Sequence, residues 1–373
     1  MNIRSVAKRA KVSTATVSRT VNNLSSVNPK TAQRVMRAIE ELGYHPNGHA
    51  RSLVLGRSRI LGLIVSDIVN PFFPEVLKSF EDLAVQQEYE VLLGSTNYDP
   101  ERMARCVGRM LERKVEGVAI MTSEMLKPLV DQFAHSNVPL VFLDVGSVKE
   151  GVSNISVDYA QGINEAVQHL LALHHQHIGF ISGPLTLKSA QIRRSAFLHS
   201  LGSFGLDEKE QLIALADHTI DGGVQAMTRL LQLKPLPTAV LCSNDLTAFG
   251  ALRAIRRAGL RVPDDISVVG FDDIHLAGFT EPPLTTIRLS RSELARQAFD
   301  ALLRHIDRGR AGEEHAIETH LIVRESTAQA TALHRRLSPG CSAPATRALV
   351  SPLFPAGEPE SPPCDRSTLR DSA

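Results

Sequence analysis

The chain has 373 residues, 43% of them hydrophobic, so it is long enough for more than one domain and apolar enough to bury a core. Its four cysteines lie far apart and form no C-x-x-C pair, a usage typical of a reducing cytoplasm rather than of a disulfide scaffold. No apolar run approaches the ~20 residues of a membrane span, and no signal-peptide core follows the basic N-terminus. We therefore expect a cytoplasmic protein that has no membrane partner.

The net charge of +1 hides an asymmetry along the chain. Residues 1–60 contain 11 Lys or Arg and 2 Glu, a net charge of +9, and the remaining residues carry a net charge of −8. A small cationic segment gathers near polyanions, because each phosphate that it neutralises releases condensed counterions. The charge pattern therefore favours a nucleic-acid partner, although a basic segment can also be a solvated surface and no more.

Three short helices are predicted near the N-terminus. Apolar residues recur at helical spacing over 3–10, with Asn2 as the N-cap, and a three-residue connection leads to a second helix over 14–22. A third helix begins after Asn28, which is followed by a proline, and it ends at Gly43. Two helices joined by a tight turn and braced by a third form the plan of a helix-turn-helix DNA-binding domain.

From residue 60 onward, short apolar runs alternate with longer amphipathic stretches. Such apolar runs are typical of parallel strands that helices cover on both faces. The amphipathic stretches predict helices over 75–87, 100–114, 161–173 and 246–258. Repeated strand-helix units of this length predict a doubly wound α/β body with two similar lobes. The predicted strands are 60–65, 90–94, 117–121, 139–144, 177–182, 238–243 and 266–271.

The composition changes again at the C-terminal end. Residues 331–373 contain seven prolines and six serines and few aromatic side chains, so they bury too little surface to offset chain entropy. We interpret this segment as a disordered tail.

Nine sequence motifs follow one another along residues 2 to about 330. They are VAKRAKVSTATVSRTVN (6–22), VNPKTAQRVMRAIEELGYHPN (27–47), ARSL (50–53), SDIVNPFF (66–73), HIGFISGP (177–184), SNDLTAFGAL (243–252), VPDDISVVGFDD (262–273), PPLTTIR (282–288) and LIVREST (321–327). In this order they resemble those of the lactose, galactose and purine repressors, the LacI/GalR family of transcriptional regulators. The resemblance implies a helix-turn-helix head over 1–46, a hinge over 47–59 and a two-lobed body over 60–330 like the periplasmic sugar-binding proteins.

The resemblance implies that the second helix reads operator DNA in the major groove. Its first turns would then contact base edges. Arg19 is the strongest candidate, because a guanidinium can pair with O6 and N7 of guanine together, although it could instead hold a phosphate. The expected base contacts are Thr14, Ala15, Ser18 and Arg19, and the expected contacts to the DNA backbone are Thr16, Tyr44 and Asn47.

The segment 47–56 is similar to the hinge of this family, which becomes helical when two copies meet over the operator. Gly48 and Gly56 disfavour a stable helix in isolation, in keeping with folding on binding. In the family a hinge leucine wedges into the minor groove and kinks the DNA, and here the matching residue is Leu53. The alternative is a plain linker whose leucine packs on the body.

The resemblance places a small-molecule effector between the lobes, at the carboxyl ends of the strands. Arg193 matches the family's ligand-clamping arginine, and His218 stands where relatives often place an aromatic side chain. A charged pair such as Arg193 and Asp272 suits hydroxyl-rich or anionic ligands, although an Asp after a strand can also simply cap the next helix. The expected effector residues are Asp67, Asn70, Phe72, Phe73, Arg193, His218, Asn244 and Asp272.

Two residues depart from the family pattern. Lys11 stands where many relatives have Gly in the turn, so a left-handed conformation there would cost ~1 kcal/mol. Ala196 replaces the usual Gly of the R-x-x-G-F motif, which could shift Arg193.

An enzyme and a periplasmic solute-binding protein are the alternatives on the same α/β body. The sequence contains no nucleotide-binding, nucleophile-elbow or zinc-protease motif, and a solute-binding protein would need a signal peptide and no DNA-binding head. A cluster of histidines at 169–177 has no carboxylate or thiol partner nearby in the sequence, so we expect no metal site and no cofactor. We predict a homodimeric repressor of carbohydrate-related genes, with operator DNA and a sugar or sugar derivative as partners.

Overall fold

The computed structural model describes residues 2–21, 27–44, 57–122, 127–144, 147–206, 212–309 and 311–330. The chain divides into two units, Met1–Thr331 and Ala332–Ala373. The second unit, and with it the predicted tail, lies outside the described residues, as do hinge residues 47–56 with Asn47 and Leu53.

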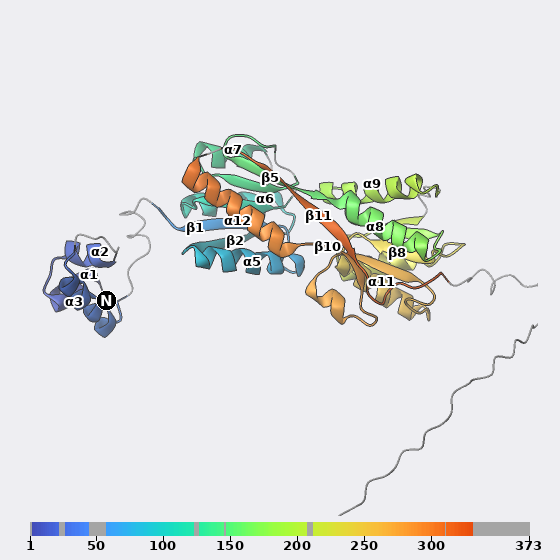
Figure 1. The fold of residues 1–373 in the computed structure, drawn as a ribbon, viewed down its shortest axis with the longest axis horizontal. Coiled ribbons are helices and arrows are strands. Elements are labelled where there is room, and N and C mark those ends of the chain that lie inside the picture. Colours follow the sequence, from blue (N-terminus) through green and yellow to red (C-terminus); the bar gives the residue numbers. More distant parts are fainter. Residues whose placement is uncertain are drawn as a thin grey trace, which may run out of the picture. The chain divides into compact units, whose positions relative to one another are not determined.

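The N-terminal head consists of three helices, α1 (Ile3–Ala10), α2 (Thr14–Val21) and α3 (Pro29–Leu42) (Figure 1). Asn2 caps α1 by accepting a hydrogen bond from the amide of Ser5, and Gly43 ends α3 in the left-handed conformation. One apolar stripe from each helix meets in a small core around Val6, Val17 and Val35.

The face of α3 that joins the head core is centred on Val35 and Ala38, which are both buried and lie about one turn apart. Ala32, Ile39 and Leu42 are half-buried, and Ile39 and Leu42 pack against the edge of this core.

The body is built on an 11-stranded sheet with the order β2-β1-β3-β4-β5-β11-β10-β9-β8-β6-β7. The first five strands and the start of β11 form one half, and the remaining strands form the other (Figure 1). The strands are β1 (Ile60–Val65), β2 (Glu90–Ser95), β3 (Gly117–Met121), β4 (Leu140–Leu143), β5 (Val152–Asp158), β6 (Ile178–Ser182), β7 (Ile213–Leu215), β8 (Ala239–Cys242), β9 (Ser267–Asp272), β10 (Thr285–Leu289) and β11 (Glu314–Ile322).

Helices cover both faces of each half, so each lobe has three layers. In the first lobe, α5 and α12 cover one face and α6 and α7 the other, and in the second lobe α8 and α9 lie opposite α10 and α11. Within the described residues the helices of the body are α5 (Phe72–Gln86), α6 (Pro100–Glu112), α7 (Lys127–His135), α8 (Tyr159–Ala172), α9 (Lys188–Ser203), α10 (Ile220–Leu230), α11 (Asp245–Arg257), α12 (Arg291–Arg308) and the short 3-10 helix η2 (His275–Phe279).

The chain passes between the lobes three times, after β5, after β10 and within β11. The first part of β11 pairs with β5 in parallel, and its second part pairs with β10 in antiparallel fashion. At the junction the buried hydroxyl of Thr319 accepts a hydrogen bond from the amide of Gly162 (3.1 Å) and donates one to the carbonyl of Asp158 (2.6 Å). Any side chain at 162 would collide with Thr319, since a Cβ there would lie 2.6 Å from its hydroxyl.

Candidate functional site

A cavity of about 80 Å³ lies where strands of both lobes end. Ser66, Thr122 and Asp144 follow β1, β3 and β4, and Asp272 ends β9, so the cavity is at the carboxyl edge of the sheet. The structure places seven of the eight predicted effector residues around it, all except Asp67. The lining residues are Ser66, Asn70, Phe72, Phe73, Tyr98, Met121, Thr122, Leu143, Asp144, Tyr159, Leu187, Ser189, Arg193, His218, Asn244, Asp272 and Leu289.

Arg193, on α9, is the cationic side chain that lines the cavity. Only 7% of its surface is exposed, and its guanidinium lies over the rings of Phe271 (4.0 Å) and Tyr159 (4.8 Å). Nη1 donates to the carbonyl of Ser243 (2.6 Å), and Nη2 lies 3.6 Å from a carboxylate oxygen of Asp272. Within the described part of the chain its Nε has no hydrogen-bond partner, so this buried donor is left for a ligand or a water.

Asp272 is the carboxylate opposite Arg193. It is 5% exposed and has φ = 105°, a conformation that residues with a side chain rarely adopt. Burial raises its pKa to about 6, against the opposing effect of the Arg193 charge. The carboxylate is therefore close to its titration range near neutral pH, and a ligand that donates hydrogen bonds to it would favour the ionised form.

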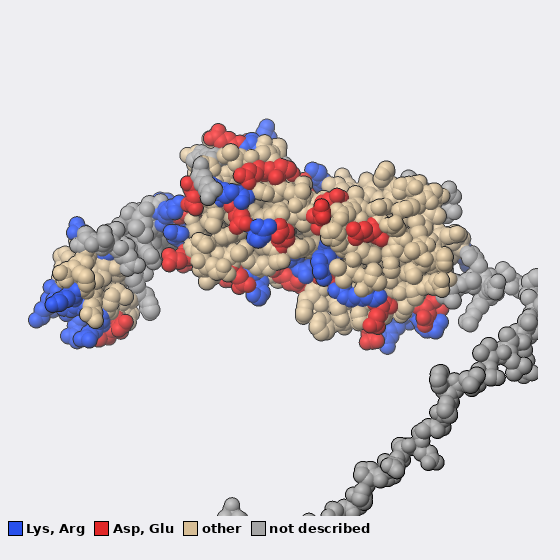
Figure 2. Space-filling view, viewed as in Figure 1, with Lys and Arg blue, Asp and Glu red and all other residues tan. Residues whose placement is uncertain are grey.

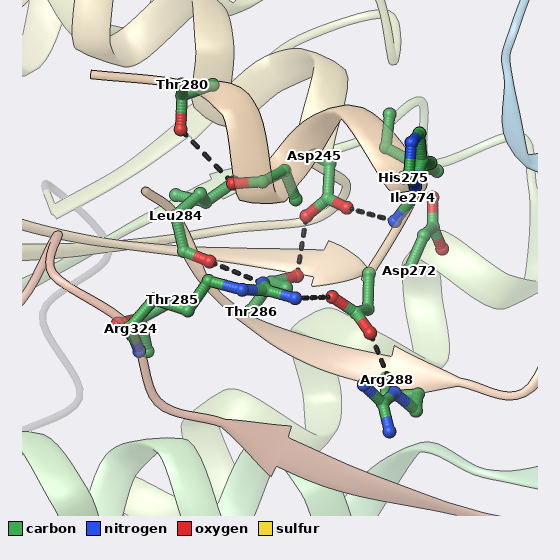
Figure 3. Close-up of polar contacts among 12 residues, drawn as sticks. Asp245, Asp272, Ile274, His275, Thr280, Leu284, Thr285, Thr286, Arg288 and Arg324 are labelled. Carbon is green, nitrogen blue, oxygen red and sulfur yellow. Dashed lines mark hydrogen bonds and ion pairs between the residues drawn. The ribbon is translucent and has the colours of Figure 1, made fainter. Parts of the chain in front are cut away.

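A polar network, centred on the buried carboxylates of Asp245 and Asp273, holds the loop that follows Asp272 (Figure 3). The carboxylate of Asp245 accepts hydrogen bonds from the amide of Ile274 (2.8 Å) and the hydroxyl of Thr286 (2.5 Å). Asp273 pairs with Arg288 (2.7 Å) and Arg324 (2.6 Å), which come from two other segments of the second lobe. These contacts keep Asp272 in its strained backbone conformation.

His218 lines the cavity from the second lobe as a neutral imidazole. Its Nε2 lies 2.9 Å from the hydroxyl of Ser243, and burial, with the nearby Arg193 charge, lowers its pKa to about 3. The ring fits only because residue 183 is Gly, since a Cβ there would lie 1.9 Å from Nε2.

Three predicted residues of the site use their polar groups locally. Asn244 caps α11, accepting from the amide of Thr247 (2.9 Å), and its Nδ2 donates to the carbonyl of His218 (3.1 Å). Asn70 accepts from the amide of Phe72 (3.1 Å), and Asp67 accepts from the amide of Val69 (2.8 Å). Asp67 thus closes a turn between β1 and α5, as Asp side chains often do by accepting from the amide two residues on.

Ten of the seventeen lining residues were not expected from the sequence, and two of these, Asp144 and Tyr159, form a hydrogen-bonded pair. The hydroxyl of Tyr159 donates to the carboxylate of Asp144 (2.5 Å), which also accepts from the amide of Val157 (2.9 Å). Burial raises the pKa of Asp144. The only sequence signal was the position of Asp144 at the end of the predicted strand 139–144, and no motif connected it with Tyr159.

The residues of α2 that are predicted to contact DNA differ in exposure. Thr14, Ala15 and Arg19 are exposed, whereas Ser18 and the predicted backbone contact Thr16 are half-buried. Thr16 lies at the helix start, where its amide donates to the hydroxyl of Ser13 (3.1 Å). Tyr44 is half-buried and packs against the head core.

The described surface of the head is strongly cationic. Lys and Arg side chains gather on the face of the head seen in Figure 2. Lys11 adopts the left-handed conformation (φ = 52°) that its position in the turn predicts. The exposed cations are Arg4, Lys8, Arg9, Lys11, Arg19, Lys30, Arg34 and Arg37, against the acidic Glu40 and Glu41.

Two of the four histidines at 169–177, His169 and His175, have structural partners. His175 is 2% exposed, and its ring nitrogens lie 3.0 Å from the hydroxyl of Thr238 and 3.0 Å from the carbonyl of Ala328. His169 lies 3.0 Å from the hydroxyl of Thr327, so both rings hold the segment that ends the body. Among the residues that the structure describes, no cluster of three or more His, Cys, Asp or Glu could hold a metal ion. No helix of the described chain is long and apolar enough to cross a membrane.

Comparison with known proteins assigns the chain to a family. Residues 2–47 match the model of bacterial regulatory proteins of the lacI family, and residues 167–327 match a periplasmic binding protein-like domain. The chain is 35% identical over 304 residues to an HTH-type transcriptional repressor PurR of Actinobacillus pleuropneumoniae, covering 82% of this chain and 90% of that protein. It is also 35% identical over 329 residues to the PurR repressor of Mannheimia succiniciproducens, with 87% and 98% covered.

Solved structures agree with this assignment. The lac repressor dimer bound to operator and the anti-inducer ONPF superposes with a TM-score of 0.78 at 30% identity, over 88% of this chain and 99% of that one. A complex of the transcriptional regulator CelR with cellobiose has a TM-score of 0.66 at 30% identity, over 87% and 99%. The chain therefore belongs to the LacI family of DNA-binding transcriptional repressors, with a helix-turn-helix head and a periplasmic-binding-protein-like effector domain.

Proposed function

We propose that this repressor responds to a neutral ligand rich in O–H or N–H donors, most simply a sugar, bound in the cavity around Arg193 and Asp272. The observation that carries the proposal is the balance of groups in the cavity. Two carboxylates, Asp144 and Asp272, line it beside one guanidinium, which already contacts Asp272 and the carbonyl of Ser243. A phosphorylated or acidic ligand would bring a further negative charge to this site and is disfavoured.

The position of the cavity couples ligand binding to the relation of the lobes. Its lining comes from both lobes, with Phe73 and Asp144 on the first and Arg193 and Asp272 on the second. A ligand bound there would contact both lobes at once. The free energy of binding can then change the relation of the two lobes, which is the requirement for an allosteric switch.

On the DNA side, we propose that two heads of a homodimer bind a near-palindromic operator. Arg19, exposed on α2, would read a guanine, with Thr14, Ala15 and Ser18 at neighbouring bases. Thr16, Tyr44 and Asn47 would contact the DNA backbone. Leu53 would enter the minor groove, so Leu53→Ala should weaken specific binding far more than non-specific binding in a fluorescence anisotropy titration; equal losses would contradict the wedge.

The effector proposal is tested first by thermal shift of the full chain against neutral sugars, sugar acids, sugar phosphates and purine bases. A ligand at 100 times its Kd should stabilise the body by about 2.7 kcal/mol. Arg193→Gln should abolish that shift, and Arg257→Gln, on the same lobe but not among the residues that line the cavity, should leave it unchanged. A shift that survives Arg193→Gln, or that appears only with sugar phosphates, would refute the proposal.

Regulation is then measured on operator fragments selected from random DNA. Adding the ligand should change the apparent operator affinity in the full chain, and the ligand effect should be absent in Arg193→Gln. We expect neither catalytic turnover of the ligand nor a need for any cofactor.

A further inference from the structure

Glu75 connects the first lobe to the loop that carries Asp272. It lies in the first turn of α5, three residues after the cavity residue Phe72. Its Oε1 accepts a hydrogen bond from the backbone amide of His275 (3.0 Å), and its Oε2 pairs with Nε of Arg291 (2.6 Å). One carboxylate of the first lobe therefore holds two segments that are more than 190 positions away in the sequence.

Both partners of Glu75 are attached to Asp272. His275 follows Asp272 by three residues and is the first residue of η2. Arg291 begins α12, at the second crossing between the lobes, and its Nη1 donates to the carbonyl of Asp272 (2.6 Å). Glu75, Arg291 and the 272–275 loop thus form a closed ring of contacts around the backbone of the expected effector carboxylate.

The surroundings of this ion pair make it stronger than a surface pair on the same helix. The side chains of Glu75 and Arg291 are 29% and 18% exposed, whereas those of Lys78 and Asp82 are 76% and 61% exposed. Water screens the first pair much less, so its loss has a larger effect.

The ring of contacts through Glu75 and Arg291 connects the 272–275 loop to the first lobe. The polar network of Figure 3, in contrast, is made of residues of the second lobe. Asp245, Asp273, Arg288 and Arg324 hold the 272–275 loop from within the second lobe. The strained φ of Asp272 persists only where neighbouring contacts determine it on several sides. Separating the lobes would break the Glu75 contacts and leave those of the second lobe in place.

We propose that Glu75 is a positioning residue for effector binding: through Arg291 and the amide of His275 it sets the orientation of Asp272 and couples that orientation to the position of the first lobe. This inference rests on the proposed effector site. Glu75 is not among the residues that line the cavity, so it need not touch the ligand, and the coupling passes through the backbone of the 272–275 loop.

The first test uses amide hydrogen exchange of the full chain without ligand. Glu75→Ala should accelerate exchange of the His275 amide at least tenfold, because that amide loses its acceptor. Glu81→Ala, an exposed glutamate of the same helix, is the matched control and should leave the rate unchanged. An unchanged rate in Glu75→Ala would overturn the proposal.

The second test reads the charge at Asp272 by carboxyl ¹³C NMR of aspartate-labelled protein. The charged or titratable groups that face Asp272 are Arg193 on α9, Arg291 on α12, Glu75 on α5 and Asp245 on α11. Glu75→Gln should lower the pKa of Asp272 and Arg291→Gln should raise it. Simple loosening of the loop would lower the pKa in both variants, so a fall in Arg291→Gln would overturn the proposal.

Ligand titrations separate this inference from the proposed function. With any compound of the panel that shifts the melting of the wild-type chain, Glu75→Ala should weaken binding at least tenfold, and Arg193→Gln should abolish it. Loss in Arg193→Gln with wild-type affinity in Glu75→Ala would overturn the positioning role alone. Wild-type affinity in both variants would overturn the proposed site itself.

Discussion

Replacement of Gly183 by alanine tests how His218 is held in the cavity. The added Cβ would lie 1.9 Å from Nε2, 2.4 Å from Cε1 and 2.6 Å from Cδ2 of His218, all far inside van der Waals contact. The ring must move away, which breaks its contact with the hydroxyl of Ser243 (2.9 Å). Overpacking of this kind costs about 1 to 3 kcal/mol, so calorimetry of the full chain should show the body unfolding at a lower temperature.

Two further variants make this prediction specific. Gly108→Ala adds a methyl group inside α6 with no atom within 4 Å, so it should stabilise the body by about 0.5 to 1 kcal/mol, the opposite sign. In a His218→Ala background the clash is removed, and Gly183→Ala should then cost little. An equal cost of Gly183→Ala with and without the His218 ring would refute the assignment of the strain to that contact.

Three other perturbations have defined outcomes. The folded chain keeps His218 neutral, with a pKa of about 3 against about 6.5 in the unfolded chain, so the free energy of unfolding should fall as the pH drops from 6.5 towards 3. The urea midpoint of His218→Gln should fall less steeply over the same pH range. Lys11→Gly removes the left-handed strain at φ = 52° and should raise the melting temperature of the head by an amount worth about 1 kcal/mol; a decrease would contradict the strain. Arg19→Lys should reduce discrimination at one operator base by about 1 to 3 kcal/mol while the salt dependence of binding stays the same, and a uniform loss on all sequences would instead indicate a phosphate contact.

The helices of the head and most strands of the body could be predicted because their signals are local. Asn2, Asn28 and Gly43 mark helix ends through contacts within one turn, and the bounds of α1 are those expected. The fully apolar strands β1, β3 and β6 lie between two helical layers, so nearly all of their residues are buried, as their composition indicates.

The strands that connect the lobes were not predicted. β11 alternates exposed and buried residues over much of its length, because its outer side chains face solvent or a polar partner, and β5 carries Ser153 and Asn154 in buried positions. Their polar groups are satisfied by distant residues, such as His305 for Ser153 (2.8 Å) and Glu314 for Asn154 (2.8 Å). Strand signals based on apolar runs miss such segments.

The candidate site also contains residues that a local sequence motif predicts and residues that only the fold brings together. Residues that belong to sequence motifs, such as Arg193 and Asp272, could be selected from the chain alone. Asp144 and Tyr159 meet through the crossing after β5, and Glu75 meets Arg291 through the packing of α5 beside α12. These pairs depend on tertiary geometry and have no spacing that a sequence pattern reports.

The three passages of the chain between the lobes constrain how the body is made on the ribosome. The first lobe contains residues 60–158 but also needs α12 and the start of β11, which are synthesised after the whole second lobe has begun to form. Until residue 318 has left the exit tunnel, β5 is paired with β4 alone, and its other side remains an open edge that can pair with other chains. Late completion of the sheet therefore leaves this edge uncovered during synthesis, and because β11 pairs with both β5 and β10, its detachment would remove a strand from both lobes at once.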